Sequence, residues 1–154
     1  MKLFIVLLCC FCFVSSAENF LNEMGPMLKE FRKIKADNNG ETKGKLKGLL
    51  AKIDKIAPKA DTEEYEIYLS AKGELLMANG DYKEAAATLK KTIAASKHYN
   101  WGVWKKIIES IYYAEGKEVA KAEYEKVLKE IGDKPLVRDF SELVGRHLDD
   151  LIKK

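Results

Sequence analysis

One pattern of small and bulky residues occurs twice in this sequence, at a distance of thirty-five positions. The matched residues are Leu69, Gly73, Leu76, Ala85 and Leu89 in the first copy, and Trp104, Ile108, Ile111, Ala120 and Tyr124 in the second. A repeat of this length is typical of a unit that buries its apolar face only by stacking on the next unit. We therefore expect Gly73 and Ala85 to lie at close helix crossings, and the bulky residues to fill the space between neighbouring hairpins.

Helical periodicity extends over nearly the whole chain after residue 20. Leu, Ala, Lys and Glu dominate, Gly and Pro fall mainly at the gaps, and no strand-like alternation persists. The pattern predicts an all-α protein with helices at roughly 20–36, 42–57, 62–78, 82–96, 101–114, 117–131 and 137–152. Because the connections are short, we expect sequential helices to pack antiparallel.

The turn inside the first copy, Asn79-Gly80-Asp81, carries both a stop and a start signal. Asn-Gly marks a turn, and Asp is a favoured residue just before a helix. Glu84 follows Asp81 by three residues, which matches a capping box in which Asp replaces Ser or Thr. We therefore predict that Asp81 caps the second helix of this hairpin.

These residues resemble the tetratricopeptide repeat family, whose signature is W-x2-L-G-x2-Y and then A-x3-F within about 34 residues. The first copy resembles it through Leu69, Gly73 and Leu76, followed by Ala85-x3-Leu89. The second copy departs from it at Ile108, where the family prefers Gly. The resemblance implies a right-handed α-solenoid of antiparallel hairpins, about seven helices in all. It assigns clear repeats to 66–99 and 101–134 within a single domain of residues 18–154.

Outside the two copies the resemblance fades into elements that would close the stack. Residues 20–57 are interpreted as a degenerate N-terminal hairpin, and residues 137–152 as a C-terminal capping helix. The apolar face predicted for this last helix consists of Phe140, Leu143, Val144, His147, Leu148 and Leu151. The alternative to a solenoid is a plain antiparallel bundle whose self-similarity is accidental.

In this family the concave surface, lined by the first helix of each pair, commonly binds peptides or other proteins. The resemblance therefore implies a non-enzymatic adaptor for an unidentified protein or peptide. The partner-binding residues that it implies are Ile67, Ser70, Glu74, Met77, Lys105, Glu109 and Tyr112. The family's clamp for a C-terminal carboxylate needs Lys and Asn at such positions, which Ser70 and Glu74 do not supply. The alternative function is a secreted helical bundle that carries a lipid or another apolar small ligand.

The first 17 residues, MKLFIVLLCCFCFVSSA, have the composition of a secretory signal peptide. Lys2 precedes an apolar run that ends at Val14, and this run is shorter than the roughly 20 residues that span a bilayer. We predict cleavage after Ala17 and export to the periplasm or out of the cell, with an uncleaved N-terminal anchor as the alternative. All three cysteines lie in this leader, so the exported chain would contain no disulfide.

Charge and catalytic motifs indicate neither an enzyme nor a nucleic-acid-binding protein. After the leader, 26 basic and 24 acidic residues are interleaved, which is typical of solvated helix faces. The nearest approach to a basic stripe consists of Lys43, Lys45, Lys47, Lys52 and Lys55, and we interpret it in the same way. The two histidines, His98 and His147, lack the spacing of a metal site, and no phosphate-binding glycine loop is present. We therefore predict no catalytic residue, no metal and no cofactor.

Overall fold

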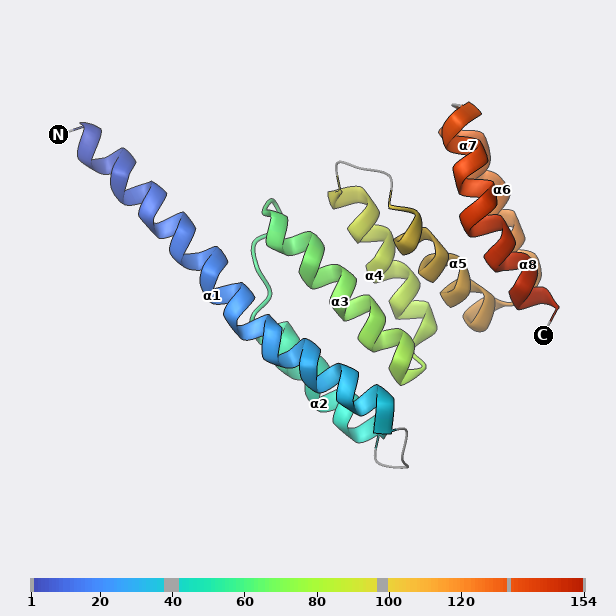
Figure 1. Ribbon diagram of the computed structural model, residues 1–154, viewed down its shortest axis with the longest axis horizontal. Helices are drawn as coiled ribbons and strands as arrows, with labels where there is room; N and C mark the ends of the chain where they lie inside the picture. The colour runs from blue at the N-terminus through green and yellow to red at the C-terminus, as the bar shows by residue number, and fades with distance from the viewer. Residues whose placement is uncertain (1, 38–41, 97–99, 133, 154) are drawn as a thin grey trace. The chain divides into compact units, whose positions relative to one another are not determined.

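The computed structural model of the chain describes residues 2–37, 42–96, 100–132 and 134–153, with side chains from Glu18 onward except at Lys134 (Figure 1). These residues form helices joined by short turns and contain no strand, which confirms the predicted all-α class. The elements are α1 (Lys2–Asp37), α2 (Thr42–Lys55), α3 (Glu63–Asn79), α4 (Tyr82–Ala95), α5 (Trp101–Glu115), α6 (Lys117–Ile131), α7 (Lys134–Phe140), η1 (Ser141–Gly145) and α8 (Arg146–Ile152).

The helices α2 to α6 begin and end within two residues of the predicted positions, whereas the two terminal helices are longer than predicted. Helix α1 begins at Lys2 and continues through Gly25 and Pro26 to Asp37. The predicted leader lies where no side chain is described, so its cleavage after Ala17 stays a prediction. Among the described helices, none combines the length and the apolar content that crossing a membrane requires.

The chain divides into two compact units, Met1–Tyr68 and Leu69–Lys154, and the boundary falls within α3. In the first unit α1 packs on α2. The buried side chains are Phe20, Met24, Phe31 and Ile34 of α1, and Leu46, Leu49 and Ile53 of α2. Their spacing of three, four or seven residues places them on one stripe of each helix. Lys52 and Glu30 form an ion pair of 3.0 Å between these helices, and the Tyr68 hydroxyl donates a hydrogen bond of 2.8 Å to Asp54.

The second unit begins with the hairpin of α3 and α4, whose turn is a Schellman motif. The Asp81 N–H donates to the Leu76 carbonyl at 2.9 Å and the Gly80 N–H donates to the Met77 carbonyl at 3.1 Å. This pair of bonds satisfies the last carbonyls of α3 and requires a left-handed residue, which Gly80 supplies with φ of 88°.

The predicted capping role of Asp81 is wrong, since its side chain makes no capping hydrogen bond to α4. The side-chain amide of Asn79, a buried residue, donates instead to the Asp81 carboxylate. A buried amide without a hydrogen-bond partner destabilises the fold, because it has lost its contact with water. The hydrogen bond to Asn79 therefore stabilises the hairpin more than a capping bond to α4 would.

Helices α3 and α4 approach each other closely where Gly73 faces Leu89. A Cβ added at Gly73 would lie 2.5 Å from Leu89 Cδ2 and 2.6 Å from Cγ. Leu89 and Ala85, both of α4, have no exposed surface. In the second copy the counterpart of Gly73 is the fully buried Ile108, so the same close approach is not available there.

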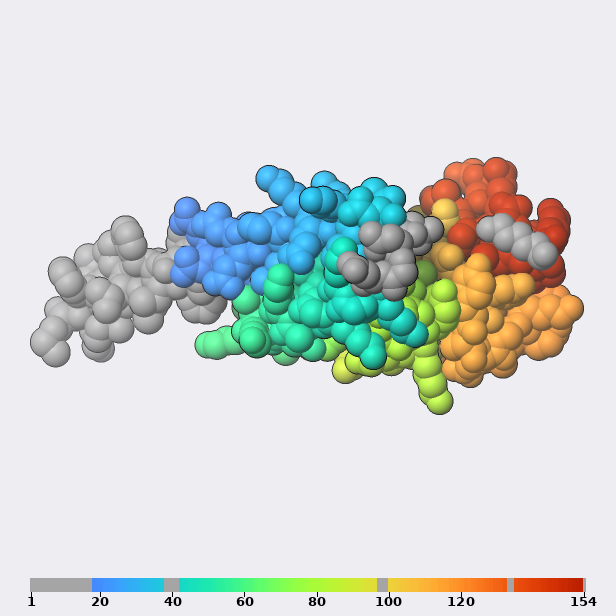
Figure 2. All heavy atoms as spheres, turned by 90° about the horizontal axis from the view of Figure 1, so that it is seen from below, coloured from blue at the N-terminus to red at the C-terminus, as the bar shows by residue number. Residues whose placement is uncertain are grey.

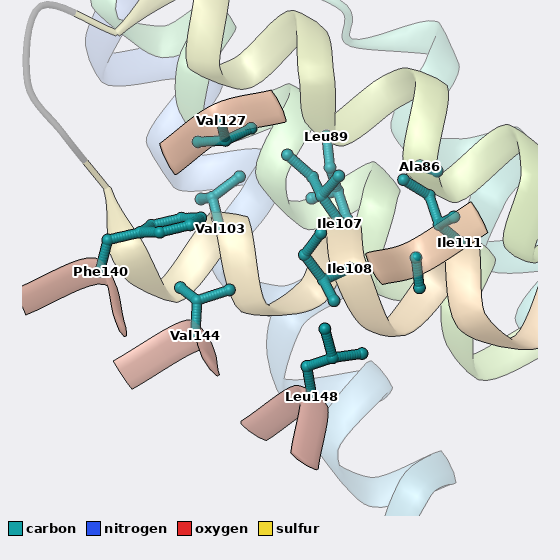
Figure 3. Close-up of a cluster of buried hydrophobic side chains, with 11 residues drawn as sticks. Ala86, Leu89, Val103, Ile107, Ile108, Ile111, Val127, Phe140, Val144 and Leu148 are labelled. Atoms are coloured by element: carbon teal, nitrogen blue, oxygen red, sulfur yellow. The ribbon is translucent and has the colours of Figure 1, made fainter. Parts of the chain in front are cut away.

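Helix α5 forms the centre of the second unit, because α4, α6, η1 and α8 all contact it. Its buried residues point toward side chains from each of these neighbours (Figure 3). The core cluster consists of Ala86, Leu89, Val103, Ile107, Ile108, Ile111, Ala120, Val127, Phe140, Val144 and Leu148. Burying these apolar groups is the main source of the unit's stability.

The last helical segment contains a π turn, η1, between α7 and α8, in which the Arg146 N–H donates to the Ser141 carbonyl five residues earlier. Just before it, Phe140 is fully buried against three aromatic rings. The distances between ring centroids are 5.5 Å to Trp101, 6.1 Å to Trp104 and 5.2 Å to Tyr124.

The prediction that Leu143 belongs to the buried face of this helix is wrong, since its side chain is 49% exposed. An α-helix would keep both the third and the fourth residue after Phe140 near the same face. The wider π turn keeps only the fourth, so Val144 and Leu148 are buried below Phe140 while Leu143 turns outward. A Cβ at Gly145, inside this turn, would lie 2.6 Å from the Tyr124 hydroxyl oxygen, which explains a residue without a side chain.

Candidate docking face on α3 and α5

The predicted partner-binding residues lie on α3 and α5 and are partly exposed. Ile67, in the first unit, is 43% exposed. The six in the second unit, all of intermediate burial, are Ser70, Glu74, Met77, Lys105, Glu109 and Tyr112. Met77 and Tyr112 pack against the core cluster, so only part of each side chain is open to a partner.

Glu74 of α3 forms an ion pair with Lys106 of α5, which joins the first helix of one sequence copy to the first helix of the next. The side chains keep about a third of their surface exposed, at 38% and 34%. Lys106 is not among the predicted residues, and sequence reasoning had no signal for it, because the contact spans 32 positions.

Glu109 lies thirty-five residues after Glu74 and also contacts a side chain of a later helix, α8. Its Oε2 lies 3.2 Å from His147 Nε2 of α8, and the two side chains are 30% and 24% exposed. The prediction placed His147 on the apolar face of the last helix. In the structure its ring reaches the carboxylate at the edge of that face.

The second helices of the two copies are also joined, by Lys90 of α4 and Glu123 of α6. Their charged atoms are 2.7 Å apart, and the Glu123 side chain is only 18% exposed. These contacts thus link α3 to α5, α5 to α8 and α4 to α6. These contacts are modest in energy, since partly exposed ion pairs contribute roughly 0.2–1 kcal/mol each.

Three tyrosines gather near the ends of α4 and α5. The Tyr82 and Tyr113 ring centroids are 4.9 Å apart, and Tyr112 meets Tyr113 edge to face at 5.4 Å. Tyr113 is 47% exposed while Tyr112 packs inward. The residue that sequence reasoning missed here is Tyr82, which only the folding of α4 beside α5 brings to the pair.

No group of three His, Cys, Asp or Glu side chains in the described ranges converges to hold a metal ion. His98 and Tyr99 lie outside the described residues. Their neighbour Trp101 packs edge-on against Phe140 of the last helical segment. Comparison with protein-family models, curated proteins and solved structures finds no match to this chain.

Proposed function

We propose that this chain is an exported, non-enzymatic adaptor that binds a protein or peptide on the face formed by α3, α5 and α8. The fold behind this function is a right-handed, tetratricopeptide-like solenoid, with the hairpins α3–α4 and α5–α6 as its repeats. The last helical segment, α7 to α8, is its cap. The N-terminal residues 1–17 are its export signal, and the mature protein works in the periplasm or outside the cell.

One observation carries the proposal, namely that equivalent helices of the two copies are joined to each other. Glu74 of α3 contacts Lys106 of α5, and Lys90 of α4 contacts Glu123 of α6. Links between corresponding helices of two hairpins are expected when the hairpins stack in one orientation, as solenoid repeats do. The repeat of the acidic position from Glu74 to Glu109 supports the same reading.

The exposed parts of this face are better suited to a polar, extended partner than to an apolar one. Carboxylate, ammonium, hydroxyl and imidazole groups alternate along it. The Glu74–Lys106 ion pair already neutralises two of these charges within the protein, and the Glu109 carboxylate contacts the His147 ring. A partner would therefore gain mostly hydrogen bonds and the side-chain area of Met77 and Tyr112, which favours moderate affinity over tight binding.

The test is affinity capture from the compartment where the protein accumulates, followed by mass spectrometry, with a face variant and a matched control. The face variant is Ser70→Lys with Lys105→Glu. The control, Ala87→Lys with Lys91→Glu, makes the same kinds of change at two exposed positions of α4. We expect the face variant to lose proteins that the wild type and the control both retain, with all three melting alike. Identical captured sets for both variants would contradict the assignment of this face.

The alternative, a helical bundle that carries a lipid, is tested on the same purified wild-type protein. Native mass spectrometry should show the bare chain mass if the protein is an adaptor. A stoichiometric apolar molecule that leaves on denaturation would replace the adaptor proposal with the carrier.

A further inference from the structure

Positive charge is concentrated in one part of the chain. Residues 29–59, which include the end of α1 and all of α2, hold ten Lys or Arg and four Asp or Glu, a net charge of +6. The remainder of the chain after the leader holds 16 basic and 20 acidic residues. The even interleaving that describes the whole sequence therefore breaks down in this hairpin.

The structure exposes all ten of these basic side chains. On α2 the buried residues Leu46, Leu49 and Ile53 define the side that faces the core. Lys43, Lys47 and Lys55 are exposed and, at 3.6 residues per turn, fall within one arc of about 120° outside that side, which we call the α2 lysine face. Gly44 and Ala51 share this arc and leave room for the ammonium groups, and Asp54, which also shares it, accepts a hydrogen bond from the Tyr68 hydroxyl. Residues 42–55 form part of the visible surface beside α1 in Figure 2.

We propose that the α2 lysine face docks on an anionic phospholipid surface. A membrane leaflet rich in acidic lipid has a negative surface potential that is nearly uniform along the surface. Each Lys or Arg near that surface therefore adds a similar amount to the binding free energy. No fixed register between lysines and lipid headgroups is needed. A curved row of flexible ammonium groups is sufficient for this kind of attraction.

Three features favour lipid over a nucleic acid or an acidic protein. Nine of the ten cations are Lys, which acts as a point charge, and one is Arg, the residue suited to bidentate phosphate or base contacts. The only aromatic residue in 29–59 is Phe31, which is buried and cannot stack on a base. Protein interfaces are depleted in Lys, so a lysine-covered helix is a poor protein-docking surface.

The position of the hairpin gives the fourth argument. Helix α1, which packs on α2, is the helix that begins with the apolar residues of the predicted leader. Whether the leader is inserted during export or retained as an anchor, this hairpin is the folded part that follows the membrane-directed segment. In the alternative in which the leader is retained as an anchor, two weak signals of this kind, one apolar and one basic, together give stable membrane attachment where one alone does not.

The experiment measures binding of the full chain to phosphatidylcholine vesicles with and without phosphatidylglycerol, by co-sedimentation at several salt concentrations. The lysine-face variant carries Lys43→Gln, Lys47→Gln and Lys55→Gln. The matched control removes three exposed lysines elsewhere, Lys83→Gln, Lys91→Gln and Lys129→Gln. All proteins keep the leader, so the ratio of anionic to neutral binding isolates the effect of surface charge.

We expect the wild type and the control to prefer anionic vesicles, and the preference to fall as salt rises. The lysine-face variant should lose roughly 100-fold of that preference, since three charges are removed from the docking surface. Equal binding to neutral and anionic vesicles by the wild type would overturn the proposal, as would equal losses in both variants. If duplex DNA or an acidic peptide, but not the vesicles, is bound through these lysines, the occupant is that polyanion and the lipid proposal fails.

Discussion

Substituting Gly73 by Ala tests the close approach between α3 and α4. The new Cβ would lie 2.5 Å from Leu89 Cδ2 and 2.6 Å from Cγ, whereas carbon atoms in contact are normally separated by about 3.5–4.0 Å. Leu89 has no exposed surface, so its side chain has little room to withdraw. Overpacking of this kind costs about 1–3 kcal/mol. The gain in helix propensity from Gly to Ala offsets about 1 kcal/mol of that cost.

A matched glycine separates the two contributions. Gly48 of α2 has nothing within 4 Å of the position of an added Cβ, so Gly48→Ala should stabilise the protein by up to about 1 kcal/mol. We therefore expect Gly73→Ala to be less favourable than Gly48→Ala by about 1–3 kcal/mol. Urea unfolding followed by circular dichroism measures both. Fluorescence of Trp101 and Trp104, the two tryptophans of the chain, reports on the second unit alone.

A double-mutant cycle identifies the partner of the clash. Leu89→Ala by itself should cost about 2–5 kcal/mol through the cavity that it leaves. In that background the new methyl group at position 73 has space, and Gly73→Ala should then stabilise by about 1 kcal/mol. The reasoning is refuted if Gly73→Ala stabilises the wild type as much as Gly48→Ala does, or if its effect is the same with and without Leu89.

Three further experiments test other parts of the second unit. Phe140→Ala should lower the free energy of unfolding by about 3–5 kcal/mol, because it removes the central ring of the aromatic cluster. Leu143→Ala should change it by less than about 0.5 kcal/mol, because this side chain is directed to solvent. Equal losses for the two variants in urea unfolding would contradict the π turn. Ser110→Ala should raise stability by roughly 1 kcal/mol, because its buried hydroxyl has no hydrogen-bond partner among the described residues, and a loss on calorimetry would indicate a partner. Lys90→Glu should cost about 0.5–1 kcal/mol and the added change Glu123→Lys should restore it, whereas additive losses would show that the pair does not interact.

The predictable part of the fold is the part that local sequence specifies. Helix ends from α2 to α6 are marked by residues such as Gly80 and Gly116, whose positive φ angles stop a helix at little cost. The apolar spacing within each helix identifies its buried side. These signals act over a few residues, so they can be recognised in the sequence without knowledge of the tertiary contacts.

The errors arise where a distant contact decides the outcome. Leu143 turns outward because Phe140 is held by rings from α5 and α6, and that geometry is fixed by residues far away in sequence. The Asp81 carboxylate accepts a hydrogen bond from the buried Asn79 amide and does not cap α4. Local sequence patterns do not indicate that Asn79 is buried. For the candidate face, periodicity indicates which residues of α3 and α5 lie together. It does not indicate that Glu74 and Glu109 are engaged by bases from neighbouring helices.

The π turn between Phe140 and Arg146 has a consequence for how this helix tolerates changes in length. A π turn holds one residue more than an α-helix needs to connect the same two ends. The helix on either side therefore keeps its place while the surplus residue is absorbed locally, with Leu143 directed to solvent. Deletion of a single residue from the π turn would convert it to an α-helical turn. Leu148 and Leu151 would then remain buried in the core. The same loss in the middle of α5 would rotate half of its core out of alignment.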